Sequence, residues 1–462
     1  MLQGIKYLML SFIFHLAFHY NSSAQIQLGT DITSAQTRDI CGYDVSLSHE
    51  GNRMAISYSS SVSVFEYNGI DWVQMGEDLE AEEGNNVYIS LSGNGDILAI
   101  GDFSSVRILE YDGTEWVQIG QDILNGNFAG SFGHRVSLSE DGLSVGVGVA
   151  SNAASVFVYK FENDEWIQVG QAILQDPDEM EYTGMSVSIS ENGNTIGVAI
   201  PGISQVRIYE LIADEWLQKG SDIENEGFYD EGVSSISLSS NGQKIAIGAP
   251  NWSSANSINI GRVRVFEYET DAWNQIGNDM ESDGAEYVGG AVSLSNDGTT
   301  LGTGYHWGGS AKIYKLENNV WIQKGATLET GSFSVSVSGN GNIAAFGNPL
   351  FDNNGPQEGV YHGLVQVFGD FVTSTAGDFN EKNQINIYPN PSAGFTTIDL
   401  GENHQIESIA IRNVLGKTVD AFAITNSIKQ VEFDINGMPG LYLIDVISNT
   451  GIHKVYKLIK SN

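Results

Sequence analysis

Short runs in which apolar and polar residues alternate follow one another from about residue 26 to residue 370. Two examples are residues 87–91, Val-Tyr-Ile-Ser-Leu, and residues 263–268, Val-Arg-Val-Phe-Glu-Tyr. Alternation with a period of two is typical of β-strands, and Gly-rich turns separate the runs. The pattern predicts an all-β protein built from many short strands.

Two motifs recur in this region and define a repeat. The Gln residues of the first motif lie 44 to 57 residues apart, which is the length of one four-stranded propeller blade. An incomplete copy, Gln27-Leu28-Gly29, stands near the start of the region without a Trp. The complete motif, Trp-x-Gln-x-Gly, begins at Trp72, Trp116, Trp166, Trp216, Trp273 and Trp321.

The second motif is an apolar residue, Ser, any residue, then Asn, Asp or Glu, then Gly. Gly after Asn or Asp supplies the positive φ of a tight hairpin, so each copy is predicted to join two strands. A third run then leads through a turn such as Asp112-Gly113 into the Trp-x-Gln-x-Gly strand, which gives four strands per repeat. The seven copies end at Gly51, Gly95, Gly142, Gly193, Gly242, Gly298 and Gly341.

The two ends of the repeat region predict a closed ring. The seventh repeat stops after residues 364–368 without a Trp-x-Gln-x-Gly strand, and the incomplete copy at Gln27 is free to supply it. Such a closure leaves no unpaired edge at the seam. We therefore expect a seven-bladed β-propeller, in which the six repeated Trp side chains pack between blades.

Composition changes divide the rest of the chain. Residues 1–24 have one Lys, an apolar run and a small-residue cleavage site, which predicts a signal peptide. No later run is long enough to span a membrane. The expected order is a signal peptide at 1–24, the propeller at 25–370, a linker at 371–382 and a small C-terminal β-sandwich at 383–462.

Charge and cysteine content narrow the functional classes. The 462 residues carry a net charge of −36, and residues 383–462 hold six basic and seven acidic side chains, so the excess acid belongs to the propeller. A surface this negative repels phosphate backbones, which excludes nucleic acid as a partner. Cys41 is the only cysteine, so no disulfide forms within the chain, and we expect a small buried apolar residue at this position.

Several predicted blades resemble the FG-GAP repeats of integrin-type propellers. The resemblance is carried by Phe132-Gly133, before one inner strand, and by residues 248–250, Gly-Ala-Pro, after another strand. Those repeats often hold Ca²⁺ in an Asp-x-Asp-x-Asp-Gly loop, and this chain contains no such run.

The last 80 residues resemble the type A sorting domain of the type IX (Por) secretion system of Bacteroidetes. The resemblance implies passage across the outer membrane by the type IX machinery, removal of the domain, and release or attachment at the cell surface. It rests on Tyr388, Pro389, Asn390, Pro391, Gly416, Lys417, Gly440, Tyr442 and Lys457.

Acidic residues gather between the outer strand of one blade and the inner strand of the next. Three interpretations are open: a solvated surface, a site for a divalent cation such as Ca²⁺ or for a cationic ligand, or an electrostatic filter for protein partners. The candidate cation ligands are Asp176, Asp178, Glu224, Glu226, Asp230, Glu281 and Asp283.

Aromatic residues outside the repeat gather in the longer second-to-third connections. They are candidates for stacking on sugar rings or packing against a protein partner, and the alternative is that they fold back to cover their own loops. The candidates are Trp252, Trp307, Tyr305, His306, Tyr361 and His362.

The predicted function is binding or adhesion outside the cell, with glycans or surface proteins as partners and no catalysis. No nucleophile elbow, His-Glu-x-x-His zinc motif or phosphate-binding loop occurs in a supporting context. The alternatives are a carbohydrate-active hydrolase or lyase on a propeller scaffold, and a structural envelope protein without a discrete ligand.

Overall fold

The computed structural model contains β-strands and a single short 3₁₀ turn in its described residues. The predicted signal peptide, most of the linker and parts of many connections lie outside those residues. In the N-terminal part the structure describes residues 26–34, 40–81, 87–102, 104–124, 131–150, 155–174, 186–224, 232–254, 257–282, 287–305, 310–328, 331–352 and 361–369. In the C-terminal part it describes residues 386–388, 395–400, 406–413, 417–423, 430–434, 440–448 and 453–460.

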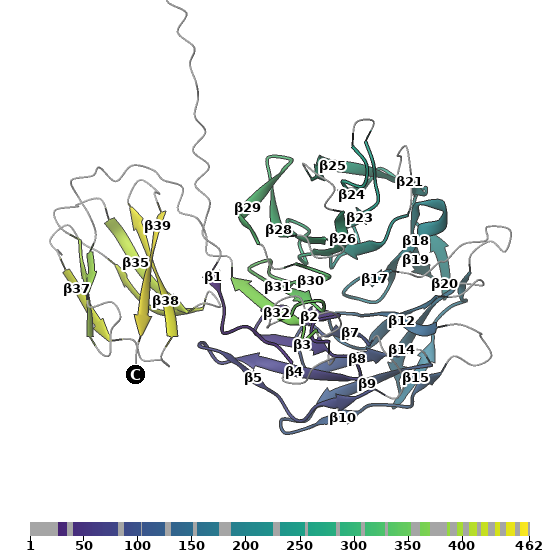
Figure 1. The fold of residues 1–462 in the computed structure, drawn as a ribbon, viewed down its shortest axis with the longest axis horizontal. Coiled ribbons are helices and arrows are strands. Elements are labelled where there is room, and N and C mark those ends of the chain that lie inside the picture. The colour runs from purple at the N-terminus through teal and green to yellow at the C-terminus, as the bar shows by residue number, and fades with distance from the viewer. Residues whose placement is uncertain are drawn as a thin grey trace, which may run out of the picture.

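The described residues of the N-terminal part form seven antiparallel sheets of four or five strands. Figure 1 shows these sheets following one another around a ring, from purple through teal to green. This arrangement is a β-propeller, as the repeat predicts. In chain order the sheets contain β2 (Val45–Leu47), β3 (Arg53–Ser57), β4 (Ser61–Tyr67), β5 (Trp72–Gln74) and β6 (Leu79–Glu80); β7 (Tyr88–Leu91), β8 (Ile97–Gly101), β9 (Ser105–Tyr111), β10 (Trp116–Gln118) and β11 (Ile123–Leu124); β12 (Ser131–Leu138), β13 (Ser144–Ala150), β14 (Ser155–Glu162), β15 (Glu165–Gln168) and β16 (Ile173–Leu174); β17 (Val187–Ile189), β18 (Thr195–Ile200), β19 (Gln205–Ile212), β20 (Glu215–Gln218) and β21 (Ile223–Glu224); β22 (Ser235–Leu238), β23 (Lys244–Ala249), β24 (Arg262–Glu269) and β25 (Ala272–Glu281); β26 (Val288–Leu294), β27 (Thr300–Tyr305), β28 (Ala311–Glu317) and β29 (Val320–Leu328); and β30 (Ser334–Val337), β31 (Ile343–Asn348) and β32 (Leu364–Gly369) together with β1 (Ile26–Gln27).

The second motif forms the hairpin that joins the first two strands of each sheet. In the second sheet Gly95 has a φ of 74°, and the Ser92 hydroxyl donates to Asn94 while it accepts the N–H of Ile97. The same serine, turn and glycine recur in the other six sheets. The prediction that Gly allows this turn is confirmed, and Asp297 in the sixth copy is a turn residue like the others.

The outer strand extends beyond the predicted Trp-x-Gln-x-Gly strand. In the first four sheets it is split into two short strands that both pair with the third strand, as β5 and β6 pair with β4. The break falls at the Gly of Trp-x-Gln-x-Gly, which has a positive φ, for example 77° at Gly76. In the fifth and sixth sheets β25 and β29 continue through this glycine with a register shift. The motif therefore encodes a bulge in the outer strand.

A ring of serine hydroxyls joins each inner strand to the next. The Ser46 hydroxyl accepts the backbone N–H of Leu91 in the following sheet, and Ser336 of the last sheet accepts the N–H of Leu47 in the first. All seven distances are 2.9–3.1 Å. We call this set the serine ring; its members are Ser46, Ser90, Ser137, Ser188, Ser237, Ser293 and Ser336.

The first and last parts of the repeat region complete one sheet together. Strand β1 pairs antiparallel with β32, with Gln27 opposite Phe368, and the N–H of Leu28 donates to Val367. The predicted closure of the ring by the incomplete motif is confirmed.

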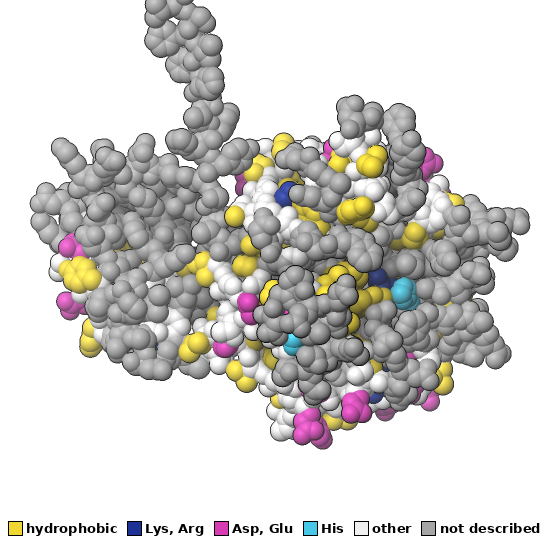
Figure 2. Space-filling view, in the orientation of Figure 1, with side chains coloured by type: hydrophobic (Ala, Val, Ile, Leu, Met, Phe, Trp, Pro, Cys, Tyr) yellow, Lys and Arg dark blue, Asp and Glu magenta, His cyan; other side chains and the backbone are white. Residues whose placement is uncertain are grey.

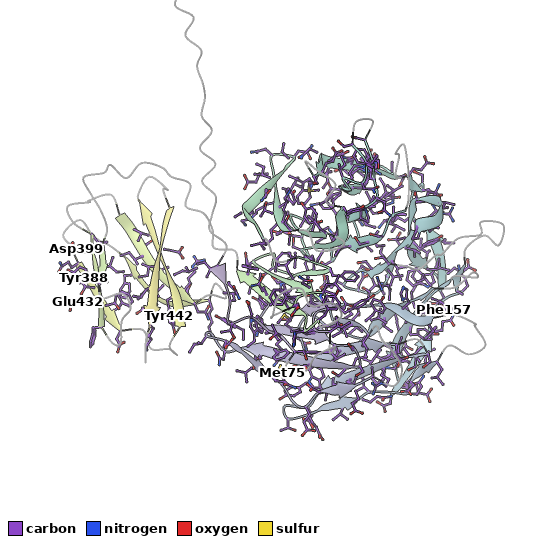
Figure 3. The ribbon with its side chains drawn as sticks, viewed as in Figure 1. Met75, Phe157, Tyr388, Asp399, Glu432 and Tyr442 are labelled. Atoms are coloured by element: carbon purple, nitrogen blue, oxygen red, sulfur yellow. The ribbon has the colours of Figure 1, made fainter. Side chains whose placement is uncertain are left out.

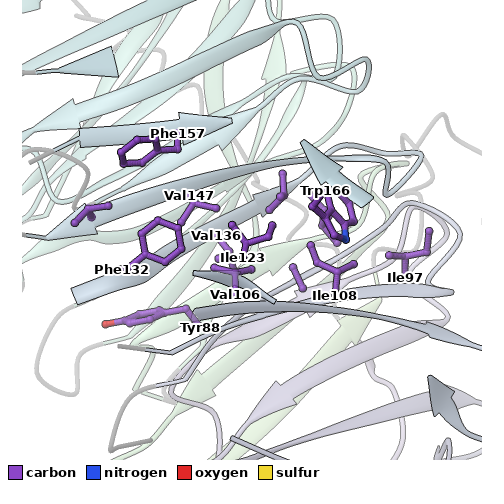
Figure 4. Close-up of a cluster of buried hydrophobic side chains, with 14 residues drawn as sticks. Tyr88, Ile97, Val106, Ile108, Ile123, Phe132, Val136, Val147, Phe157 and Trp166 are labelled. Carbon is purple, nitrogen blue, oxygen red and sulfur yellow. The ribbon is translucent and has the colours of Figure 1, made fainter. Parts of the chain in front are cut away.

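The repeated Trp side chains lie between sheets, as predicted. Each indole N–H donates to a backbone carbonyl of the preceding outer strand, for example Trp216 to Val169 at 2.9 Å. The other five bonds are 2.7–3.1 Å long. The indole of Trp216 lies directly against Gly170 of the preceding sheet. A Cβ added to Gly170 would be only 2.7 Å from the Trp216 ring. Figure 4 shows Trp166 at one end of the apolar cluster between the second and third sheets.

The C-terminal part forms two further sheets with their own apolar core, as the predicted sandwich requires. One contains β33 (Asn386–Tyr388), β34 (Phe395–Asp399) and β37 (Gln430–Asp434). The other contains β35 (Ile406–Asn413), β36 (Thr418–Ala423), β38 (Gly440–Ser448) and β39 (His453–Lys460). Buried Ile398, Ile411 and Ile444 contribute to the core between them.

We call the six indole hydrogen bonds to the preceding outer strands the outer girdle. Its geometry predicts that two substitutions of Trp216 lower the free energy of unfolding by different amounts. Trp216→Phe leaves the Val169 carbonyl without its donor, and we expect a loss of about 1–2 kcal/mol. Trp216→Ala also opens a cavity, and we expect about 3–5 kcal/mol. Trp252→Ala, at a half-buried loop position, is the control and should cost less than about 1 kcal/mol. Denaturation midpoints of the mature chain measure this order, and equal midpoints for Trp216→Ala and Trp252→Ala would contradict the packing role.

Candidate functional site at the channel mouth

The inner strands begin at one end of the central channel, on the face where the outer-to-inner connections arrive. The residues just before or at these strand starts differ between sheets, whereas the serine ring further along is uniform. We call this end the channel mouth and define it by Tyr43, Tyr88, His134, Arg135 and Phe333.

Aromatic side chains from four neighbouring sheets touch one another at the channel mouth. The Tyr43 ring lies 5.2 Å from Phe333 and 5.7 Å from Tyr88, measured between centroids. The hydroxyls of Tyr43 and Tyr88 are 3.3 Å apart, and the His134 ring stands edge-on to Tyr88 at 4.9 Å. In Figure 4 Tyr88 lies at the opposite end of its cluster from Trp166, with its hydroxyl directed away from the cluster. Tyr88 is buried, and the other three rings are half-buried.

Arg135 covers the Tyr88 ring. Its guanidinium carbon is 4.0 Å from the ring centroid, and Nη1 donates to the carbonyl of His134 at 2.9 Å. Among the described residues, no carboxylate oxygen lies within 4 Å of its nitrogens, and its other N–H groups have no acceptor. An Arg guanidinium has five donors in a planar fork, so most of this fork is open to a ligand.

The equivalent position helps to hold the ring together in four of the other six sheets, and the remaining two sheets have Tyr88 and Ala291 there. Asp44 accepts the N–H of Ile89, and Ser186 accepts the N–H of Ile236, each in the next sheet. The hydroxyls of Ser235 and Ser334 donate to carbonyls of the sheet that follows. Arg135 makes no such bond to the next sheet among the described residues. Its departure from the repeat therefore has no structural explanation of this kind.

A bulge sets the direction of His134 and Arg135. The pairing of β12 with β13 shifts register between Phe132 and Arg135, and Gly133 has a φ of 76°. A Cβ on Gly133 would lie 2.7 Å from the Asp102 carbonyl, so only glycine fits there. The buried Phe132 anchors the bulge in the core. The Phe-Gly pair that carries the FG-GAP resemblance thus positions the next two side chains.

The electrostatics of the mouth leave Arg135 as its cation. Burial lowers the pKa of His134 to about 4, and the charge of Arg135 acts in the same direction, so the imidazole is neutral at pH 7. Burial raises the pKa of Asp44 to about 6, although the Ile89 N–H and the charge of Arg135 oppose that rise. Burial also raises the pKa of Tyr43, whose hydroxyl stays protonated.

A second polar group closes the other end of the channel. Glu140 accepts from Asn296 Nδ2 at 2.8 Å and lies 2.7 Å from His49 Nδ1, so three non-adjacent sheets are tied together. A Cβ at Gly93 or Gly339 would lie 2.4 Å from Glu140 or His49, so these glycines make room for the crossing side chains. We call His49, Glu140 and Asn296 the brace. A cavity of about 180 Å³ lies beside it, lined by the turn residues and the apolar residues before them.

The predicted aromatic ligand site is only partly compatible with the structure. Tyr305 is completely buried in the core and His362 is almost completely buried, so the prediction that they contact a ligand at a rim is wrong. Trp252 is half-buried and covered by the guanidinium of Arg262 at 4.4 Å, whereas Tyr361 is exposed. His306 and Trp307 lie outside the described residues.

Most of the predicted cation ligands lie outside the described residues, which include two of them. Glu224 and Glu281 are the last residues of β21 and β25, so they belong to strands that pair with the third strand and not to connections. No group of three His, Cys, Asp or Glu in the described part of the chain is arranged to hold a metal ion. Figure 2 shows the acidic side chains of the described residues in separate small groups. The five candidates outside the described residues are Asp176, Asp178, Glu226, Asp230 and Asp283.

Part of the acidity has a structural role. The Gln of the first motif donates to an Asp four residues later, as Gln218 does to Asp222 at 2.6 Å. The same bond joins Gln74 to Asp78, and three further copies of the motif repeat it. Cys41 is fully buried, as predicted.

Sequence reasoning missed the residues of the channel mouth. The signal for them was in the aligned repeats: the two positions before the first Val or Ile of each inner strand carry large or charged residues in the first three sheets and Ser, Gly or Ala at most places in the others. The brace was missed in the same way, because its members occupy the variable position of the second motif.

The residues of the predicted sorting motif that the structure describes lie on both C-terminal sheets. Tyr388 is exposed on β33 and Tyr442 is buried on β38, as labelled in Figure 3. Lys417 closes a turn with Asn413, whose side chain accepts the Lys417 N–H at 2.9 Å. Gly440 lies on β38 and Lys457 on β39, and these two strands pair in the four-stranded sheet. Pro389, Asn390, Pro391 and Gly416 lie outside the described residues.

Comparison with protein families identifies the class of the C-terminal part. Residues 386–461 match the family of secretion system C-terminal sorting domains. The chain therefore carries a type IX sorting domain, which marks it for export by that machinery. No helix among the described residues has the length and apolar character needed to cross a bilayer.

Comparison with solved structures identifies the fold of the N-terminal part. The β-propeller domain of Cps50 (Swd1) from Myceliophteria thermophila matches with a TM-score of 0.51 and 11% identity, covering 76% of this chain and 99% of that domain. Hydrazine synthase from Kuenenia stuttgartiensis matches with a TM-score of 0.47 and 14% identity, covering 68% of this chain and 94% of that one. No curated protein matches the chain. The first likeness supports the propeller fold alone.

Two groups at the mouth predict opposite pH effects on stability. The unfolded chain protonates His134 near pH 6.5, whereas the native protein does so near pH 4, so this group's contribution to stability is lost as the pH falls through that interval. Native Asp44 takes up its proton near pH 6, before the unfolded chain does, so it adds stability as the pH falls towards 3.8.

Variants separate these two contributions. Between pH 7 and pH 4.5, we expect His134→Gln to gain thermal stability relative to the wild type, by about 1–3 °C. Asp44→Asn should lose stability relative to the wild type over the same interval. Thermal unfolding midpoints at both pH values measure the two trends. Parallel shifts in both variants would show that the mouth does not hold these groups as described.

The brace at the far end of the channel is predicted to contribute to the free energy of unfolding. Glu140→Ala leaves His49 and Asn296 without their shared acceptor, and we expect a loss of about 1–2 kcal/mol. Glu191→Ala removes one bond to the Ser240 hydroxyl and should cost less. Chemical denaturation of both variants gives the comparison, and an equal cost would mean that the brace adds nothing to the ring.

Proposed function

We propose that this protein is an exported binding module whose ligand site is the channel mouth. The observation that carries the proposal is Arg135, which occupies a position where four of the other six sheets use a side chain to join the ring. It stacks on Tyr88 and leaves most of its donors unused within the described residues. A rigid ring of sheets supplies a fixed platform for such a site.

The mouth has features that favour binding over chemistry. It offers half-buried aromatic faces at Tyr43 and Phe333, one cation, and a neutral imidazole. Asp44 is tied to two backbone N–H groups, so its carboxylate serves the join between the first two sheets. Glycoside hydrolysis generally uses a pair of carboxylates at a set separation, and Asp44 is the one carboxylate described beside the mouth.

Export supports the extracellular setting of this function. The sorting domain at 386–461 delivers the propeller across the envelope, where glycans and surface proteins are the available partners. We propose that the mature propeller acts there as an adhesion or ligand-capture domain, either released or held at the surface.

Binding is tested with the mature full chain on a glycan array and on immobilised surface-protein extracts. We expect retention by at least one ligand class, with Tyr43→Ala and Arg135→Gln each weakening it about tenfold or more. Arg264→Gln is the matched control, because Arg264 also lies over an aromatic ring, Phe266, and donates to a backbone carbonyl, but on a third strand. Retention that is insensitive to both mouth variants would place the site elsewhere. Turnover of a retained glycan would overturn the proposal in favour of an enzyme.

A further inference from the structure

We infer that the ligand of the channel mouth is a sugar that carries a carboxylate, bound with the carboxylate on Arg135 and the sugar ring against Tyr43 or Phe333. This inference rests on the proposed function and adds the chemical class of the ligand. It depends on three properties of the mouth: an open guanidinium fork, adjacent aromatic faces, and a strongly negative surrounding protein.

The open fork selects an anion with two oxygens. Nη1 of Arg135 donates to the His134 carbonyl, and the guanidinium carbon lies 4.0 Å from the centroid of the Tyr88 ring, so two contacts hold the group in place. A planar fork of N–H donors matches the two oxygens of a carboxylate. His134 is neutral and donates no second positive charge. The site is therefore built for one anionic group.

The neighbouring side chains favour a hydroxyl-bearing ring as the rest of the ligand. Tyr43 and Phe333 are half-buried rings with centroids 5.2 Å apart, and the Tyr43 hydroxyl lies 3.3 Å from the Tyr88 hydroxyl. Aromatic faces next to hydroxyls suit the apolar and polar faces of a sugar.

The charge of the protein limits the ligand to few carboxylates. The chain has a net charge of −36, nearly all of it in the propeller, so an extended polyanion is repelled. Screening at physiological salt acts over about 8 Å, which leaves a single carboxylate at Arg135 largely unaffected by distant acids. The expected ligand is an acidic sugar within a short or mostly neutral glycan.

The decisive comparison uses digalacturonate and its dimethyl ester, in which each carboxylate is replaced by an uncharged methyl ester on the same sugar framework. Binding to the mature full chain is measured by calorimetry at physiological salt. We expect the acid to bind at least tenfold more tightly than the ester, because a charge-assisted hydrogen bond is lost in the ester.

Two variants of Arg135 test the contact itself. Arg135→Gln should bind acid and ester equally, and Arg135→Lys should keep part of the preference because it retains the charge without the fork. Arg264→Gln should keep the whole preference. Thermal unfolding of each variant excludes loss of the fold as the cause.

The outcomes separate this inference from the proposed function. Equal binding of acid and ester by the wild type overturns the acidic-sugar assignment and leaves a binding site at the mouth. A second outcome also overturns the acidic-sugar assignment alone. In it the wild type binds neither compound, but it retains a ligand on the array that Tyr43→Ala fails to retain. Binding of neither compound and no array ligand sensitive to the mouth overturns both.

Discussion

The N-terminal ring depends on the hydrogen bond between a serine hydroxyl of one inner strand and a backbone N–H of the next. Each inner strand is the edge of its sheet, so every second N–H along it has no partner within that sheet. Ser46 supplies the acceptor for Leu91, and the same bond is repeated around the described inner strands until Ser336 returns to Leu47. A serine is small enough to let the edges approach and polar enough to satisfy them. The ring is thus held at its centre without closing the channel with bulky side chains.

The indole hydrogen bonds join neighbouring sheets at the circumference of the ring, as the serine ring joins them at the centre. Each indole reaches back over a glycine of the preceding sheet and donates to the carbonyl beside it, as Trp216 does at Val169. Together the two sets fix the angle between neighbouring sheets, because one contact is near the axis and the other is far from it. Positions that follow the repeat are therefore accounted for by architecture. Positions that depart from it, such as Arg135 and Glu140, need another explanation.

The sequence was sufficient to predict the repeated features and insufficient for the departures from them. The hairpin motif recurs in every sheet and Trp-x-Gln-x-Gly in six of the seven, and both depend on local geometry, so the sheets, the hairpins and the closure by β1 followed from counting. Tyr305 was misjudged because its place near a loop suggested a rim, whereas its strand, β27, carries it into the core. The channel mouth could not be assembled from one sequence, because Phe333 and Tyr43 are far apart in the chain and meet only when the ring closes.

The distribution of positive charge gives Arg135 its significance. Arg53 forms an ion pair with Asp96, Arg207 with Asp222, and Arg262 with Asp279, so these cations stabilise strands and neutralise neighbouring acids. Arg135 lies where no carboxylate oxygen of the described residues is within 4 Å, although the protein has a large excess of acid. Its remaining N–H donors have no acceptor among the described residues and are available to a ligand. A ligand that brings its own carboxylate can pair with this guanidinium, and the negative surroundings then reject ligands that bring many carboxylates.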